Sequence, residues 1–380
     1  MKLQWPKGLN ESVFLAEYWQ KKPLLLRAAF ENFENPIDPN ELAGLACEED
    51  CNSRYIEHCG NNEWRLSPGP LSEDFFDDVT GSEWSLLVSD VEKLLPEFKQ
   101  YLEPFRFLPH WRIDDLMISY APVGGSVGAH VDQYDVFLLQ ADGVREWQIE
   151  NQPRHGTTPS PSSTIALLGD FAADETWRLK PGDMLYLPPQ YAHHGIAIDD
   201  PCMTWSIGFR APSIDEMIPE ISNYLLEAEG AQVRFQDPAR SATHSPGKID
   251  NQDLASLRSM LRDALNPSDE ILNQWIGRLV TEPKEIADPQ EETPVTSSEI
   301  ATILEADGTL HCNSQIRVAY TVTGTGTELY ANGKRYTCSA KLAQAIADKH
   351  TVTSVDVTTS DTELLTLLCR NHVILLPDND

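Results

Sequence analysis

The sequence predicts a mainly β protein with α-helices added towards its C-terminal end. Residues 1–212 hold short stretches of alternating apolar and polar residues, separated by turns rich in Gly, Pro and Asp. Between residues 213 and 280 the apolar residues instead recur at helical spacing. A third region, from residue 291, mixes both patterns. Many short strands without strong helices between them favour a sandwich or barrel for the first region.

The strands of the first region can be placed by their β-branched and aromatic residues and by the turns that bound them. Six are expected, at residues 117–120, 135–140, 146–149, 163–168, 183–187 and 203–209. We therefore predict a β domain that covers residues 1–212.

The second region begins with a capping box, Ser213 to Glu216. Its apolar residues share helical spacing and are Met217, Ile218, Ile221, Leu225, Leu226, Leu254, Leu257, Leu261, Leu265, Ile271, Trp275 and Leu279. The region is either packed core or a protein–protein interface. Because so few helices cannot bury their own apolar faces, we predict a homodimer that forms mainly through residues 213–290.

The third region follows a linker, residues 281–294, which contains three prolines and many acidic residues. Helices are expected at 297–304, 339–349 and 361–369, and strands at 315–320, 328–331, 335–338 and 373–376. This order predicts a winged-helix-like domain over residues 291–380.

Composition limits the partners and the compartment. The net charge is −30, from 59 acidic and 29 basic side chains. This charge argues against direct nucleic-acid binding and suits a basic protein partner. The other explanation of the acidic charge is solubility alone. Seven scattered cysteines argue against a disulfide framework, and the N-terminus has no apolar signal segment. We expect a cytoplasmic protein that does not span a membrane. Cys47, Cys51, His58 and Cys59 fit no zinc-binding spacing, so ordinary thiols are preferred.

A candidate metal site lies at His130, Asp132 and His193. Residues two apart in an extended chain point to the same face, so one ion can bind both His130 and Asp132. Two imidazoles and one carboxylate are the ligand set of non-haem Fe(II) oxygenases, which leaves the other face of the metal open. His194 competes with His193 for the third position, but neighbouring strand residues face opposite sides, so only one is expected to reach the metal.

Glycine spacing supports this site. Gly124 stands six residues before His130, and Gly182 stands six before Pro188, with His193 five further on. These spacings resemble those of cupin-type double-stranded β-helices. Asp132 replaces the second histidine of the usual cupin motif, which gives the iron-binding pattern. The spacing from Pro188 favours His193 over His194 as the distal ligand.

An Fe(II) centre with an open face needs two electrons from a co-substrate, and 2-oxoglutarate with dioxygen would meet this need. The far carboxylate of 2-oxoglutarate requires a cation inside the barrel, and a guanidinium binds it with paired hydrogen bonds. Arg145 is the expected partner, since it lies among apolar and aromatic residues. Arg178 and Arg210 are rivals, and Arg145 could instead be an exposed hairpin charge beside Gly143.

Longer segments resemble a known family. Residues 17–27 look like the opening segment of JmjC-type cupin proteins, and residues 130–137, 185–189 and 206–212 closely resemble bacterial ribosomal oxygenases. The resemblance implies an Fe(II)- and 2-oxoglutarate-dependent hydroxylase of ribosomal proteins. Its bacterial branch is similar to an arginine 3-hydroxylase that acts on the sixteenth protein of the large ribosomal subunit.

Carried over by position, the resemblance implies catalytic iron ligands at His130, Asp132 and His193 and a carboxylate anchor at Arg145. Ser206 is expected to line the co-substrate pocket. The chain departs from the family in having His194 directly after the distal ligand and Glu146 after Arg145.

The substrate arginine needs a path to the iron, and Tyr134 and Asp135 are candidates for lining it because they follow the metal ligands closely. A basic ribosomal protein would suit the acidic chain. Two alternatives remain: a non-catalytic cupin-like scaffold that binds a basic partner, and a hydroxylase of histidine in a ribosomal protein.

Overall fold

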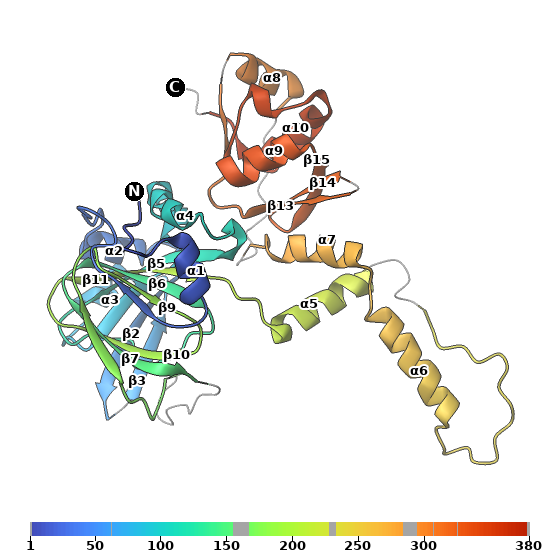
Figure 1. The fold of residues 1–380 in the computed structure, drawn as a ribbon, viewed down its shortest axis with the longest axis horizontal. Coiled ribbons are helices and arrows are strands. Elements are labelled where there is room, and N and C mark those ends of the chain that lie inside the picture. The colour runs from blue at the N-terminus through green and yellow to red at the C-terminus, as the bar shows by residue number, and fades with distance from the viewer. Residues whose placement is uncertain are drawn as a thin grey trace. The chain divides into compact units, whose positions relative to one another are not determined.

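The computed structural model describes residues 2–61, 63–154, 167–227, 233–283, 295–306, 308–324 and 326–377. Contacts divide the chain into two compact units, Met1–Ala211 and Pro212–Asp380. The first holds two antiparallel sheets and the second holds the later helices with two smaller sheets (Figure 1). None of the described helices has the length and apolar character that a bilayer span requires.

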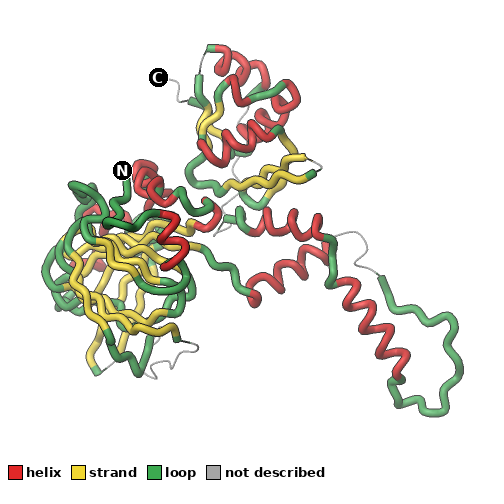
Figure 2. The backbone as a smooth tube through the Cα atoms, viewed as in Figure 1, coloured by secondary structure: helices red, strands yellow, loops and turns green. Residues whose placement is uncertain are grey.

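The first unit is built on an eight-stranded sheet with the order β1-β9-β6-β11-β5-β4-β2-β3 and a three-stranded sheet with the order β10-β7-β8. The strands are β1 (Leu24–Leu26), β2 (Ser53–Gly60), β3 (Glu63–Pro68), β4 (Trp84–Val88), β5 (Ile113–Ala121), β6 (Asp135–Asp142), β7 (Arg145–Pro153), β8 (Glu175–Leu179), β9 (Met184–Leu187), β10 (Tyr191–Ala197) and β11 (Cys202–Phe209). Figure 2 shows the strands gathered in this unit.

Alternation along the strands separates two apolar layers. Phe137 of β6 packs with Phe14 of α1 (Glu11–Glu17) and Phe105 on the outer face of the large sheet. Leu138, the next residue, belongs to an inner cluster with Trp147 of the small sheet. Because one face of β6 packs on helices and the other faces the small sheet, the inner face is where a site can form.

Short helices complete the outer layer. They are α2 (Pro39–Leu45), α3 (Glu73–Asp77) and α4 (Val91–Leu94), with 3₁₀ turns at Pro96–Tyr101, Glu103–Phe105 and His110–Arg112. The helix α2 has a full capping box. The Asp38 side chain accepts from the backbone N–H of Glu41, and the Glu41 side chain accepts from the backbone N–H of Asp38.

Five of the six strands expected in this unit are confirmed as β5, β6, β7, β9 and β11. The sixth, 163–168, lies outside the described residues apart from its last two. The strands β1, β2, β3, β4, β8 and β10 were not predicted. Charged and polar residues interrupt the apolar pattern of β2, β3, β8 and β10, whereas β1 and β4 are short apolar runs that periodicity alone does not identify as strands.

The second unit contains α5 (Ile214–Glu227), α6 (Asn251–Ala264), α7 (Asp269–Leu279), α8 (Ser297–Glu305), α9 (Ala340–Gln344), which continues as a π-helix to Lys349, and α10 (Thr362–Arg370). Its strands are β12 (Leu310–Cys312), β13 (Val318–Thr323), β14 (Gly326–Ala331), β15 (Lys334–Cys338), β16 (Thr351–Val352) and β17 (Ile374–Leu375). The predicted helices and longer strands are confirmed; the short strands β12 and β16 were missed.

The helix α7 packs on the sheet β13-β14-β15. Any Cβ at Gly277 would lie 2.3 Å from the Tyr330 ring, so the glycine lets the helix approach the sheet. The contacts join the residues from Pro212 onwards into one compact unit, and the expected division at residue 290 within it stays a prediction. Most of the expected linker, residues 284–294, lies outside the described residues.

Candidate metal centre

The structure brings together the three side chains predicted as metal ligands. One donor atom from each of His130, Asp132 and His193 lies within 4.8 Å of the others. The Asp132 carboxylate is 3.9 Å from Nε2 of His130 and 3.5 Å from Nε2 of His193. Among the described residues this is the one group of histidine, cysteine and carboxylate side chains placed to hold an ion.

Backbone carbonyls fix the orientation of both imidazoles. Nδ1 of His130 lies 2.9 Å from the Gly128 carbonyl, and Nδ1 of His193 lies 2.9 Å from the Tyr191 carbonyl. A carbonyl can only accept, so Nδ1 carries the hydrogen in each ring and the Nε2 lone pair is left for the metal. The rings point their free nitrogens at the same carboxylate.

Burial keeps His193 in the form that binds a metal. Its side chain is 2% exposed. Burial, followed by the nearby His130, lowers the pKa of His193 to about 4, so the ring is neutral at neutral pH. The donor set of two imidazoles and one carboxylate fits Fe(II) with an open coordination face.

His194 does not join this group. It pairs with Gln148 in the β10–β7 ladder, and its ring lies 6.1 Å from that of Phe171. The side chain faces the opposite side of the small sheet from His193. The geometry therefore separates the two adjacent histidines, as the strand alternation predicts.

Arg145 lies on the same inner face as His193. In the β10–β7 ladder His193 pairs with Ile149, Gly195 with Trp147 and Ala197 with Arg145, so Arg145 and His193 are roughly 13 Å apart along the strands. Arg145 is 3% exposed, and its Nε and Nη2 have no hydrogen-bond partner among the described residues. A buried guanidinium without an anion is costly, so this position fits a carboxylate ligand.

The rival arginines lie at other positions. Arg178 is 66% exposed and pairs at 2.9 Å with Glu146 on the outer face of the small sheet. The backbone N–H of Arg210 donates to the carbonyl of Arg112, beyond the end of β11. The buried position of Arg145 also rules out the exposed hairpin charge considered for it.

Hydroxyl groups line the inner face of the large sheet. Ser206 and Thr204 alternate along β11 with Trp205, which packs in the outer core. Ser119 of β5 donates to the Thr204 carbonyl at 3.2 Å. Ser206 was expected here, whereas Thr204 and Ser119 were not. Thr204 could have been found from its spacing of two residues from Ser206, and Ser119 from the register that pairs β5 with β11.

Tyr134 stands beside the metal ligands. Its ring is half-exposed, and the negative charge of Asp132, then burial and Asp115, raise the pKa of its hydroxyl. Asp115 lies across from Gly208, where a Cβ would be 3.2 Å from its Oδ1 and 4.0 Å from the Tyr134 ring. Sequence reasoning missed Asp115, although the pair Asp114-Asp115 near the start of β5 was a visible signal.

Asp135 is placed away from this site, contrary to expectation. Its carboxylate is fully buried and accepts hydrogen bonds from the Tyr186 hydroxyl at 2.7 Å, from Gln20 at 2.9 Å and from Arg112 at 3.2 Å. Asp135 shares the outer face of β6 with Phe137. It ties the N-terminal segment to the sheet and does not line a path to the metal.

Comparison with known proteins places these features in a family. A JmjC domain model matches residues 100–217, and a ROXA-like winged-helix model matches residues 259–370. The chain is 36% identical over 337 residues to the ribosomal protein uL16 3-hydroxylase of Escherichia coli (strain K12), covering 88% of this chain and 87% of the relative. It is 33% identical over 347 residues to a probable ribosomal oxygenase of Haemophilus influenzae, covering 87% and 82%.

The chain belongs to the ribosomal oxygenase family. A crystal structure of Escherichia coli YcfD matches it with a TM-score of 0.85 and 32% identity, covering 99% of this chain and 100% of YcfD. A YcfD structure in complex with cobalt and 2-oxoglutarate matches with a TM-score of 0.83 and 31% identity, covering 99% of each. These findings confirm the predicted family, the JmjC cupin fold with a winged-helix domain, and the oxygenase class.

Proposed function

We propose that this ribosomal oxygenase is an Fe(II)- and 2-oxoglutarate-dependent protein hydroxylase that adds a hydroxyl group to the β-carbon of an arginine in a large-subunit ribosomal protein. The observation that carries the proposal is the shared inner face of the His130–Asp132–His193 group and the buried guanidinium of Arg145, whose Nε and Nη2 have no partner among the described residues. A non-catalytic scaffold needs neither.

Each side chain has a defined task. Nε2 of His130, Nε2 of His193 and the Asp132 carboxylate would hold the iron on one face. When bound, Fe(II) supplies the activation of dioxygen, with 2-oxoglutarate as the source of two electrons. The Arg145 guanidinium would pair with the far carboxylate of 2-oxoglutarate, and the buried Ser206 hydroxyl on the facing sheet would line the same pocket.

Apolar side chains exclude water from this space. Leu138 and Leu185 of the large sheet and Trp147 and Ile149 of the small sheet form one buried cluster. In such surroundings an ion pair between Arg145 and a carboxylate is less screened than in water. The co-substrate would therefore be bound firmly at its far end while its near end stays free for the metal.

Asp115 would accept hydrogen bonds from the substrate guanidinium. Asp115 supplies a carboxylate beside Tyr134, whose ring is half-exposed next to Asp132. A guanidinium held by Asp115 and stacked on Tyr134 would be fixed at its tip, so that a carbon nearer the backbone meets the oxidant. The net charge of −30 favours approach of a basic ribosomal protein.

A peptide assay tests the proposed function. A ribosomal-protein peptide with the target arginine should gain one oxygen in the presence of Fe(II) and 2-oxoglutarate, and fragmentation should place the oxygen on that arginine. The lysine analogue should gain little, because lysine lacks the planar guanidinium. Oxidation of a histidine-bearing ribosomal peptide in place of the arginine peptide would move the substrate assignment to histidine.

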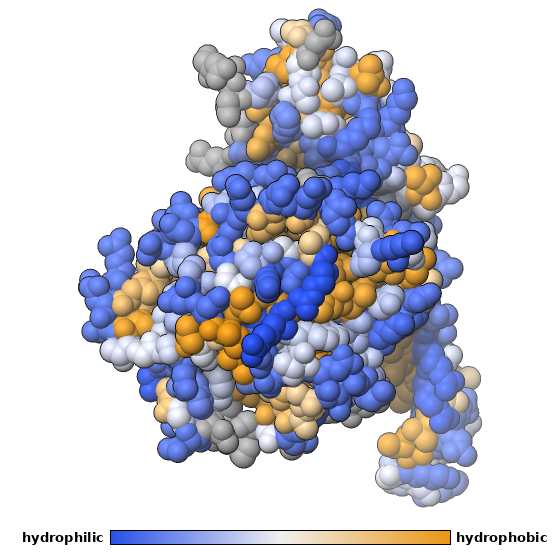
Figure 3. All heavy atoms as spheres, turned by 60° about the vertical axis from the view of Figure 1, so that its left-hand side comes forward, coloured by the Kyte–Doolittle hydropathy of each residue, from blue (hydrophilic) through white to orange (hydrophobic). Residues whose placement is uncertain are grey.

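The assembly we propose is a homodimer formed through the helices of the second unit. Apolar side chains there are exposed in the single chain: Ile218 is 57% exposed, Leu257 46%, Leu261 61% and Leu265 58%. On the face drawn in Figure 3 most side chains are hydrophilic and the apolar ones form separate patches. A second copy of this chain would cover these four exposed side chains.

The same function places the protein in the cytoplasm, where its ribosomal substrate is made. We propose no direct nucleic-acid contact for the winged-helix domain, because phosphate binding requires a concentration of basic side chains and the chain as a whole is strongly acidic.

A further inference from the structure

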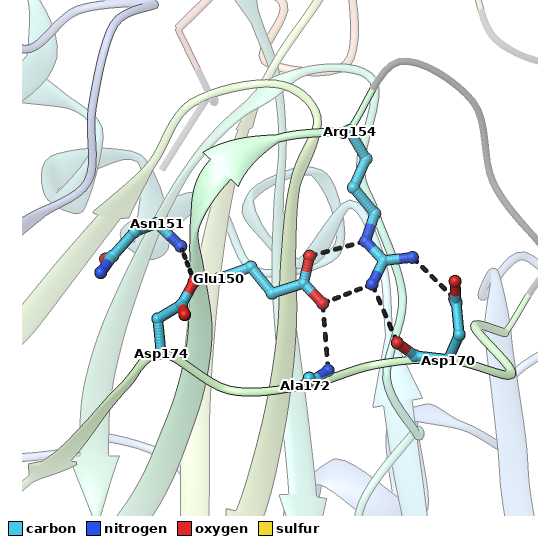
Figure 4. Close-up of polar contacts among 6 residues, drawn as sticks. All are labelled: Glu150, Asn151, Arg154, Asp170, Ala172 and Asp174. Atoms are coloured by element: carbon cyan, nitrogen blue, oxygen red, sulfur yellow. Dashed lines mark hydrogen bonds and ion pairs between the residues drawn. The ribbon is translucent and has the colours of Figure 1, made fainter.

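Arg154, just beyond the end of β7, holds two carboxylates at once (Figure 4). Its Nε donates to Glu150 at 2.6 Å and its Nη1 donates to Asp170 at 2.7 Å. Nη2 donates to Glu150 as well and, at 3.1 Å, to the Asp170 carbonyl. We call Glu150, Arg154 and Asp170 the Arg154 clamp. It joins the end of one strand to a segment 16 residues further along the chain.

The clamp is better shielded than an ordinary surface ion pair. The side chains of Arg154 and Glu150 are 17% and 13% exposed, and Asp170 is 55% exposed. Glu150 also accepts from the backbone N–H of Ala172 at 3.1 Å. The hydrogen bonds from Arg154 lower the pKa of the Glu150 carboxyl. A bidentate guanidinium–carboxylate pair fixes geometry as well as distance.

One branch of the clamp leads to His130. Asp170 anchors a segment in which the N–H of Leu168 donates to the Ala129 carbonyl at 2.9 Å. The Leu167 side chain packs so closely on Gly128 that a Cβ there would lie 2.8 Å from it. The Gly128 carbonyl is the group that accepts from Nδ1 of His130. The segment behind the clamp therefore supports the acceptor that orients this ligand.

The other branch leads to Asp132 and His193. The backbone N–H of Arg154 donates to the Gln190 carbonyl at 2.8 Å, and the N–H of Gln190 donates to the Asp132 carbonyl at 2.7 Å. The next residue, Tyr191, supplies the carbonyl that accepts from Nδ1 of His193. Both routes start at Arg154, and together they reach all three ligands.

We propose that the Arg154 clamp is a positioning device for the metal centre. Arg154, Glu150 and Asp170 do not touch the metal; they hold the backbone segments that orient His130, Asp132 and His193. Outer partners of metal ligands typically change metal affinity by about 10- to 100-fold when they are removed. The inference rests on the proposed function only in taking the triad as a metal site, and its test requires no substrate.

Co(II) binding to the full chain tests the clamp, because Co(II) reports both affinity and geometry through its visible absorption. Arg154→Met removes all the side-chain donors at similar length, so we expect Co(II) affinity to fall by about tenfold or more, with a changed absorption band. The matched control is Arg178→Met, which breaks an exposed pair with Glu146 on the same sheet. This control should bind Co(II) with native affinity and a native spectrum.

Two more variants guard against a simple folding defect. Asp170→Asn removes one arm at a half-exposed position and should weaken Co(II) binding by a smaller factor; Arg154→Lys should recover part of the loss, since it keeps the charge. Native Co(II) affinity and spectrum in both Arg154→Met and Asp170→Asn would overturn the proposal. So would an equal loss in Arg178→Met. Failure of the peptide assay with intact Co(II) effects would count against the proposed substrate alone.

Discussion

His130 and His193 are paired across an isolated antiparallel bridge, in which the backbone N–H of each donates to the carbonyl of the other at 3.0 Å. The ring centroids lie 4.3 Å apart. Main-chain bonds therefore hold the two imidazoles close together. A site built in this way is preorganised, so substitutions of its ligands should affect metal binding more than folding.

The three ligands should respond as one group. His130→Ala, Asp132→Ala or His193→Ala should each abolish 2-oxoglutarate turnover and weaken Co(II) binding strongly, with little change in thermal unfolding. His194→Ala is the matched control, because its side chain lies on the other face of β10, and it should retain the metal. Strong Co(II) binding by His193→Ala together with a loss in His194→Ala would reverse the choice of distal ligand.

Arg145 should control the 2-oxoglutarate requirement. Removing a buried charge partner of a carboxylate costs on the order of 2–5 kcal/mol. Arg145→Ala should raise the apparent 2-oxoglutarate requirement by at least about thirtyfold while Co(II) affinity stays near native. Arg178→Ala, an exposed arginine from the neighbouring strand, should leave that requirement unchanged. An unaltered requirement in Arg145→Ala would remove this residue from the co-substrate site.

A side chain at Gly195 should destabilise the fold, because it would overlap the Trp147 ring. A Cβ at this position would lie 2.7 Å from the indole ring, which packs between Arg145 and His193 on the inner face. Gly195→Ala should lower the free energy of unfolding by about 1–3 kcal/mol through overpacking. Gly44→Ala, in α2 with open space around it, should cause no loss. Equal unfolding curves for both variants would contradict the tight packing described here.

Glu92 should make stability depend on pH. Its carboxylate is 5% exposed and accepts from the N–H of Leu116 at 2.9 Å; burial raises its pKa from 4.5 to about 7. The folded state therefore binds more protons than the unfolded chain between these pH values, so the free energy of unfolding falls as the pH rises through them. Between pH 5 and pH 8 the ionisation of Glu92 should lower the free energy of unfolding by about 2 kcal/mol.

Denaturant unfolding of Glu92→Gln at pH 5 and pH 8 checks this expectation. The amide keeps an oxygen for the Leu116 N–H but cannot ionise, so the stability difference between the two pH values should shrink by about 2 kcal/mol relative to the native chain. A pH dependence equal to that of the native protein would show that Glu92 titrates normally.

The exposed helical leucines should be needed for self-association. Leu257→Asp with Leu261→Asp in α6 should convert a homodimer into a monomer at micromolar concentration, as measured by light scattering, because burying two carboxylates in an apolar interface is unfavourable. Val322→Asp is the control, since Val322 is 65% exposed on the β13–β14 hairpin, away from α6. A native chain that is monomeric in the same measurement would remove the dimer proposal.

Much of the fold could be read from local patterns. Period-two alternation found β5, β6, β7, β9 and β11, and capping residues with helical spacing found the helices of the second unit. The strand β10 escaped because its two adjacent histidines and a glycine break the alternation. The short strands β12 and β16 escaped because three or two residues carry too little pattern to detect.

The sequence by itself predicted the three side chains that the structure groups as candidate metal ligands, because the spacing of His130 and Asp132 and the strand alternation that separates His193 from His194 are local properties of an extended chain. Only the tertiary structure decided which arginine is buried, that Asp135 belongs to the outer core, that Asp115 lies near Tyr134, and that Arg154 bonds to both Glu150 and Asp170. The physical reason is that burial, ion pairing and the face on which a side chain lies depend on neighbours brought close by folding, from elements far apart in the chain.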